Sequence, residues 1–139
     1  MVKMSAASAL DLTVMSSYLQ DATVRVGDMA WIPSQRRFGL VCNRFMWEET
    51  GATRHRCRSG LHIDHVIMAR TRGFAPRNKD HMLELLTIHA TEHDDKITVR
   101  IAFAGGADVH LDAEVVEVHM DDIGEPWNTP HVPDHEDKG

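Results

Sequence analysis

Arginine is the residue type in this sequence that offers the most chemistry. Its planar guanidinium donates paired hydrogen bonds that match a carboxylate or a phosphate. Eight arginines fall between residues 36 and 72, and Trp47 adds an aromatic side chain of the kind that anchors a binding surface. We predict a face that binds an anionic partner, made of Arg36, Arg37, Arg44, Trp47, Arg54, Arg56, Arg58, Arg70 and Arg72.

The charges are divided unevenly along the chain. Residues 34–79 carry a formal net charge of +7 and residues 80–139 carry −12, within a total of −6. A molecule polarised in this way can attract an acidic protein surface, a nucleic acid or a second copy of itself as a homodimer. The overall acidity and the lack of a recognised nucleic-acid-binding motif make a nucleic acid the weaker candidate for this partner. A second interpretation stays open, in which the acidic half of the same molecule neutralises the basic surface.

Histidine and aspartate supply an alternative function, that of a small metal-assisted hydrolase. His62 and Asp64 share one face if they lie on a strand, and His89 from the predicted strand at 83–92 would complete the ligand set. The sequence contains neither an HExxH nor a CxxC motif. We therefore predict a binding module rather than an enzyme, without a cofactor.

The two cysteines are the remaining candidates for reactivity. Cys57 lies between Arg56 and Arg58, whose positive charges are expected to lower the pKa of its thiol. Cys42 falls on the apolar face of a predicted strand and is expected in the core. No neighbouring residue is placed as a base for Cys57, so we predict no catalytic role for it.

One helix and several short strands must position these residues. Ser8 and Asp11 have the spacing of a helix cap, and apolar residues follow at helical intervals, which predicts a helix over 9–20. Alternating apolar residues predict strands at 23–26, 28–32, 37–45, 61–71, 83–92, 97–103 and 108–118, with a loop at 48–59. At 115–123 the pattern fits either a bulge or a short helix.

These elements predict an α+β fold. We expect an N-terminal helix plus about six mostly antiparallel strands that form a strongly curved sheet or a partly open barrel. Gly124 and Pro126 should end a single globular domain at 1–127, followed by a disordered, acidic, histidine-containing tail at 128–139. No apolar run is long enough to cross a membrane, and the first residues lack the apolar segment of a signal peptide. We therefore expect a cytoplasmic protein without a membrane partner.

Six short motifs occur in order along the chain: Leu-Gln-Asp-Ala at 19–22, Val-Gly-Asp at 26–28, Asn-Arg-Phe-Met-Trp at 43–47, Arg-His-Arg-Cys-Arg at 54–58, Phe-Ala-Gly-Gly at 103–106 and Asp-Ile-Gly-Glu-Pro-Trp at 122–127. Through them the chain resembles domain of unknown function 2948, an uncharacterised, mainly alphaproteobacterial family, over about residues 8–127. Members tend to have an apolar strand before the helix, of which residues 2–4 are a weak version. The resemblance implies a single cytoplasmic domain and no known activity.

Overall fold

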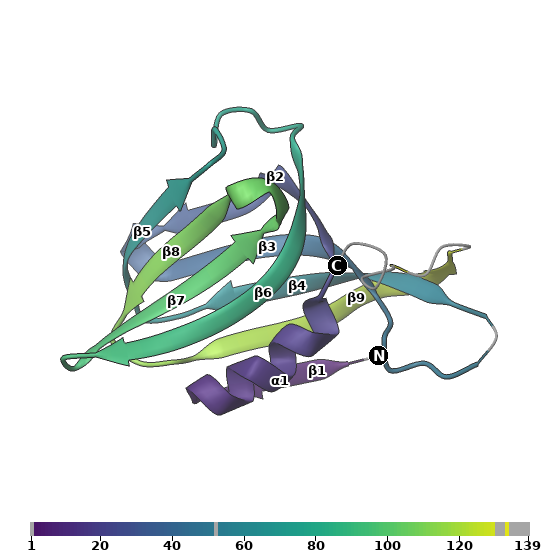
Figure 1. Cartoon of the computed structure of the whole chain (residues 1–139), viewed down its shortest axis with the longest axis horizontal. Helices are drawn as coiled ribbons and strands as arrows, with labels where there is room; N and C mark the ends of the chain where they lie inside the picture. Colours follow the sequence, from purple (N-terminus) through teal and green to yellow (C-terminus); the bar gives the residue numbers. More distant parts are fainter. Residues whose placement is uncertain (1, 52, 130–132, 134–139) are drawn as a thin grey trace.

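The computed structural model describes residues 2–51, 53–129 and 133, and this part of the chain forms one α-helix and nine β-strands (Figure 1). The helix, α1 (Ala9–Leu19), lies between the first two strands in the sequence. The strands are β1 (Lys3–Ala6), β2 (Thr23–Ile32), β3 (Arg37–Phe45), β4 (His55–Ile63), β5 (Val66–Arg72), β6 (Met82–His93), β7 (Lys96–Phe103), β8 (Asp108–Ala113) and β9 (Val118–Asn128). Two short 3-10 turns are η1 (Pro33–Gln35) and η2 (Ala104–Gly106).

The strands form one antiparallel sheet in the order β1-β9-β4-β3-β2-β6-β7-β8-β5. This confirms the α+β class with an antiparallel sheet. The predicted strongly curved sheet or partly open barrel was wrong: β1 and β5 remain separate edges, and the sheet is neither closed nor strongly curled. In the described part of the chain, no helix is long and apolar enough to cross a membrane.

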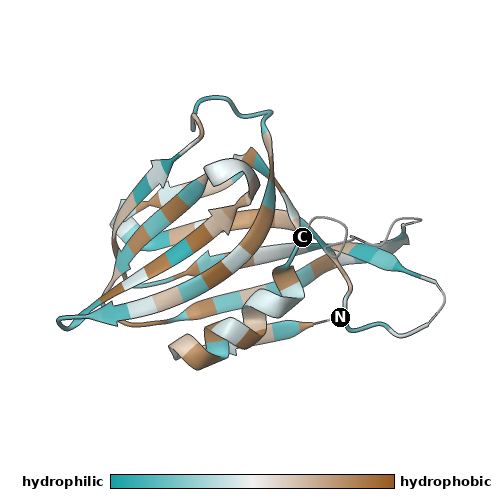
Figure 2. Cartoon of the chain, viewed as in Figure 1, coloured by the Kyte–Doolittle hydropathy of each residue, from teal (hydrophilic) through white to brown (hydrophobic). Residues whose placement is uncertain are grey.

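A single hydrophobic core holds the elements together. It takes buried side chains from α1 and from every strand, because apolar residues alternate with polar ones along the strands (Figure 2). Val99 and Ile101 of β7 are both 0% exposed, as their alternation predicted. In β3, which has the predicted bounds, Phe38, Leu40 and Cys42 point into the same core.

Helix α1 confirms the predicted helix to within one residue. The Ser8 hydroxyl accepts a hydrogen bond from the Asp11 amide, 3.1 Å away, and so caps the first turn. Leu12, Met15 and Leu19 form the apolar stripe of α1 and are completely buried. The Ser16 hydroxyl accepts a hydrogen bond from the Ile88 amide of β6. The helix therefore stabilises the sheet by covering β6.

Strand β4 differs from the prediction at both ends. It begins at His55, inside the predicted loop at 48–59, because residues 55–59 pair with β3 on one side and β9 on the other. The predicted strand at 61–71 is two strands. His65 adopts a positive φ of 60° and turns the chain, so that β4 pairs with β3 and β9 while β5 pairs with β8.

The C-terminal strand was also missed. The bulge or short helix expected at 115–123 does not form. Instead, β8 ends at Ala113, and a separate strand, β9, runs from Val118 through Gly124 and Pro126 to Asn128. Gly124 takes a positive φ of 76° and lets the strand continue past an irregularity in its pairing with β4. Most of the predicted disordered tail at 128–139 lies outside the described residues; Asn128 belongs to β9, paired with His55.

Candidate functional site

The outward face of β4 brings several of the predicted residues into one line. Side chains along a strand alternate between its two faces, and Cys57, Ser59, Leu61 and Ile63 all point into the interior. The opposite face, called here the β4 outer row, consists of Arg56, Arg58, Gly60 and His62. Arg54 directly precedes the strand and extends the row toward its start.

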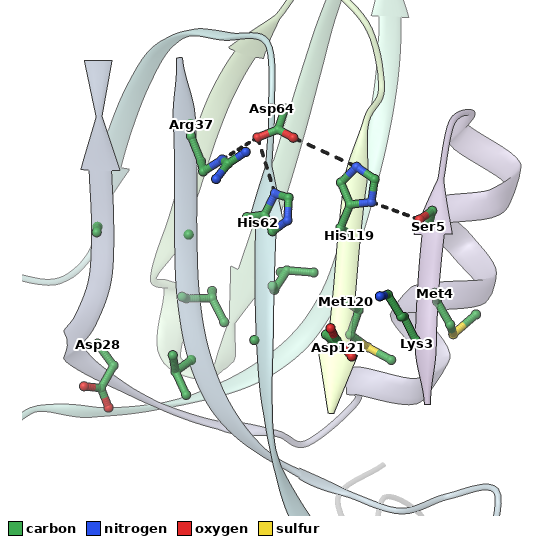
Figure 3. Close-up of a pocket in the computed structure, with 16 residues that line it drawn as sticks. Lys3, Met4, Ser5, Asp28, Arg37, His62, Asp64, His119, Met120 and Asp121 are labelled. Atoms are coloured by element: carbon green, nitrogen blue, oxygen red, sulfur yellow. Dashed lines mark hydrogen bonds and ion pairs between the residues drawn. The ribbon is translucent and has the colours of Figure 1, made fainter. Parts of the chain in front are cut away.

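A groove of about 670 Å³ lies along the second half of this row (Figure 3). Ala30, Gly39 and Gly60, which are two glycines and an alanine, contribute to its lining from the three neighbouring strands β2, β3 and β4. Charged side chains surround them: Lys3 from β1, Asp28 from β2, Arg37 from β3, and Asp121 from β9. The groove is thus lined by charged residues of both signs.

Five of the eight predicted arginines are paired with carboxylates of the same chain at 3.1 Å or less. Arg36 pairs with Glu114, Arg37 with Asp64 at 2.7 Å, Arg44 with Asp122 at 2.7 Å, Arg70 with Asp112 at 3.1 Å and Arg72 with Asp108 at 2.8 Å. Four of these pairs join the basic segment 34–79 to the acidic segment 80–139. Much of the charge division seen in the sequence is therefore balanced inside the molecule.

Arg54, Arg56 and Arg58, called here the β4 arginines, are held differently. Arg54 donates to the backbone oxygen of Glu49 at 2.7 Å, and Arg56 donates to that of Asn43 at 3.2 Å. For Arg58 the nearest carboxylate contact is a loose 3.8 Å to Asp28. Among the residues that the structure describes, the β4 arginines have no carboxylate partner closer than this.

Arg44 and Trp47 both make polar contacts within the molecule. The Arg44 side chain is completely buried and contacts Asp122 and Glu48. Burial alone would lower the pKa of Arg44, but the two carboxylates outweigh it and raise this pKa. The indole of Trp47 is half-buried and donates a hydrogen bond to the Gln20 backbone oxygen at 2.8 Å.

A second group of polar side chains lies at the other end of the β4 outer row, around the β4–β5 turn. Asp64 accepts a hydrogen bond from Arg37 at 2.7 Å and lies 3.3 Å from His62 and 3.9 Å from His119 (Figure 3). The imidazole of His119 also lies 3.4 Å from Glu117. Burial raises the pKa of Asp64, but the hydrogen bonds with Arg37 and Glu117, together with the nearby charges of His62 and Arg37, outweigh it and lower this pKa.

This cluster contains two of the three residues predicted for a metal site. His62 and Asp64 are present, whereas His89 lies on β6 opposite Arg100 of β7 and is no member of the cluster. Glu117 and His119 were missed, and they come from β9 and the residue before it. Their ligand atoms and that of Asp64 lie within 4.8 Å of one another, a spacing that fits a single metal ion.

The expectation for Cys57 was wrong. The side chain points into the core and is 0% exposed, because residue 57 alternates with the outward-facing arginines on either side. Burial raises the pKa of the Cys57 thiol despite the nearby guanidinium of Arg44. Cys42 is buried as predicted, and burial raises its pKa to about 12. Neither thiol is therefore ionised at neutral pH.

Comparison with known proteins identifies one family. A family model described as "Protein of unknown function (DUF2948)" matches residues 2–135, which is nearly the whole chain. No curated protein and no solved structure matches the chain.

Proposed function

The chain belongs to the DUF2948 family of proteins of unknown function, and we propose that it is a binding module whose β4 outer row holds an acidic segment of a partner protein. The observation that supports this most directly is the difference between the β4 arginines and the other predicted arginines. Arg54, Arg56 and Arg58 keep donors that no carboxylate of the described chain holds closely, and a partner carboxylate can accept from them.

Apolar residues next to the β4 arginines favour a protein partner. Arg58 is the cross-strand neighbour of Ile123 on β9, and Arg56 is that of Trp127. Ile123 is 41% exposed and Trp127 is 42% exposed, so both offer apolar area beside the guanidinium groups. Protein interfaces combine aromatic residues and arginine in this way, while charged residues surround the contact.

The carboxylates at the groove argue against a nucleic acid. Asp28 and Asp121 lie on the rim, and the whole chain carries −6. A nucleic acid presents a negative charge at every nucleotide and would be repelled at these positions, whereas a polypeptide can place its acidic residues opposite the arginines alone.

Fluorescence anisotropy with a labelled decapeptide of alternating glutamate and serine at about 50 mM salt tests the proposal, because its carboxylates share one face when it is extended and electrostatic attraction is weakly screened there. Arg54→Glu, Arg56→Glu and Arg58→Glu combined should weaken binding about a hundredfold, since each exposed pair contributes up to about 1 kcal/mol. The matched control combines Arg77→Glu, Lys79→Glu and Lys96→Glu, which changes the net charge equally at exposed positions elsewhere.

Binding that the control variant retains and the β4 variant loses would support the proposal. Equal loss in both variants would show that net charge alone attracts the peptide, and the absence of binding to the unmodified protein would refute the proposal. Tighter binding of a labelled single-stranded RNA than of the glutamate–serine peptide would assign the face to nucleic acid instead.

A further inference from the structure

We infer that Asp64, Glu117 and His119 bind one divalent transition-metal ion, with Zn²⁺ as the best-matched ion, at the end of the groove. This site is independent of the proposed protein partner: it uses none of the β4 arginines, and it stands on the arrangement of three side chains around the β4–β5 turn.

The three donor atoms converge on one point. His119 presents Nε2, which lies 3.4 Å from Oε2 of Glu117 and 3.9 Å from Oδ2 of Asp64. Ligands about 2.0–2.1 Å from a tetrahedral metal ion are separated by roughly 3.4 Å, so the observed spacing needs only small side-chain adjustments. Asp64 and His119 both line the groove, so a further coordination position can open toward it.

In each of the two carboxylates, the oxygen that does not face His119 is contacted by a neighbouring side chain. Oδ1 of Asp64 is bound by Arg37 and lies 3.3 Å from His62, and Oε1 of Glu117 lies 3.4 Å from His65. Each carboxylate thus directs its second oxygen toward His119. Outer partners of this kind orient metal ligands and are a regular feature of metal sites.

Ser5 completes the arrangement on the side of the histidine. Its hydroxyl lies 2.9 Å from Nδ1 of His119 (Figure 3). When a metal ion binds Nε2, the ring proton of His119 lies on Nδ1 and can be donated to the Ser5 hydroxyl, which holds the imidazole in the orientation that the ion requires. The serine comes from β1, so the first strand of the chain fixes the orientation of a ligand on β9.

The backbone holds the ligands in register before any ion binds. His62 of β4 is the cross-strand partner of His119 of β9, and the Asp64 amide donates to the Glu117 backbone oxygen at 3.0 Å. His65 follows in a left-handed conformation, with φ of 60°, that ends β4 at the required point. Two segments far apart in the sequence are thereby fixed next to each other.

The chemistry of the donors selects the metal. One imidazole nitrogen and two carboxylate oxygens suit Zn²⁺ and, less strongly, Mn²⁺, whereas Mg²⁺ prefers oxygen ligands alone in an octahedral shell with several waters. We therefore expect the affinity to fall in the order Zn²⁺, Mn²⁺, Mg²⁺.

Titration calorimetry of the full chain with Zn²⁺ alone tests the site. The unmodified protein should bind one equivalent at this site, and His119→Ala or Glu117→Gln should each weaken this binding about a hundredfold. The Glu117 side chain is 41% exposed, and glutamine has nearly the same shape as glutamate. Glu117→Gln should therefore fold normally even if His119→Ala does not. Ser5→Ala should weaken binding about tenfold, because it removes only the orienting hydrogen bond.

Two controls separate this site from incidental binding by other histidines. His89→Ala and the double variant His131→Ala, His135→Ala should both retain the affinity of the unmodified protein. Absorption bands of bound Co²⁺ in the visible range, present in the unmodified protein and lost in Glu117→Gln, would report the same ligands directly. Failure of the unmodified protein to bind Zn²⁺, or binding that Glu117→Gln leaves unchanged, would overturn the inference.

Discussion

Replacing Asp122 with asparagine should destabilise the protein strongly, because the side chain is the main partner of a buried arginine. The side chains of Asp122 and Arg44 are both 0% exposed, and their closest charged atoms lie 2.7 Å apart. Asp122 also accepts hydrogen bonds from the Ser59 hydroxyl and the Val2 amide. The carboxylate therefore joins β3, β4, β9 and the residue before β1.

The expected cost of Asp122→Asn can be estimated from these contacts. Removing one partner of a buried ion pair costs about 3–5 kcal/mol, and the lower value applies because Glu48 still contacts Arg44 at 2.6 Å. A loss of about 3 kcal/mol is a large part of a total stability on the order of 7–20 kcal/mol for a chain of this length. The variant should fold, with a melting temperature lower by about 10 °C.

Urea denaturation of the two proteins measures this difference directly. The matched control is Asp112→Asn, which breaks a pair with Arg70 in which the side chains are 38% and 57% exposed. Such exposed pairs contribute less than about 1 kcal/mol. A loss of stability for Asp122→Asn no larger than that for Asp112→Asn would refute the assignment of a stabilising role to the buried pair.

The pKa of Asp122 determines how the stability difference between the unmodified protein and Asp122→Asn depends on pH. Burial raises the pKa of Asp122, but hydrogen bonds from Arg44, Ser59 and the Val2 amide outweigh it and hold this pKa well below its usual range. A lowered pKa in the folded state stabilises the protein fully above the unfolded pKa of about 4, and this contribution is lost as the pH falls toward the folded pKa. The stability gap between the unmodified protein and Asp122→Asn should therefore shrink below about pH 4.

Two further substitutions test the fold. Ile101→Asp should abolish soluble expression, because the side chain is 0% exposed and an unpaired buried charge costs several kcal/mol; a normally folded variant would show that this face of β7 is wrongly assigned. Gly73→Ala should lower the melting temperature far more than Gly105→Ala. Both glycines have φ of 81°, but a Cβ at Gly73 would lie 2.5 Å from the Gly106 backbone oxygen, whereas one at Gly105 would meet no atom of the described residues within 4 Å. Equal shifts would contradict this packing.

Sequence patterns over a few residues correctly predicted α1 and β7, because contacts between residues close in the sequence or a strict apolar alternation mark these two elements. The helix follows from the Ser8 cap and its apolar stripe, and β7 follows from the strict alternation that buries Val99 and Ile101. The start of β4 was missed because its outward residues are arginines and its inward residues are Cys57 and Ser59, so no apolar alternation marks it. Its neighbours β3 and β9 make it a strand through hydrogen bonds that a local pattern does not reveal.

The candidate site was predictable only in part for the same reason. His62 and Asp64 stand out by their spacing, but the contribution of His119 depends on the register between β4 and β9, and β9 was missed because Gly124 and Pro126 lie within it. Likewise, the sequence presents eight similar arginines. Contacts such as that between Arg44 and Asp122, 78 positions apart, decide which of them remain available.

The most direct test of the proposed binding face is to locate the bound peptide. Backbone amide NMR signals of the ¹⁵N-labelled protein would be followed while the unlabelled glutamate–serine peptide is added at about 50 mM salt, where screening is weak. We predict that the largest shifts fall on Arg54, on residues 55–62 of β4 and on the partners of these β4 residues at 119–128 of β9. Shifts concentrated instead around Arg70 and Arg72 on β5, or no shifts at saturating peptide, would contradict it.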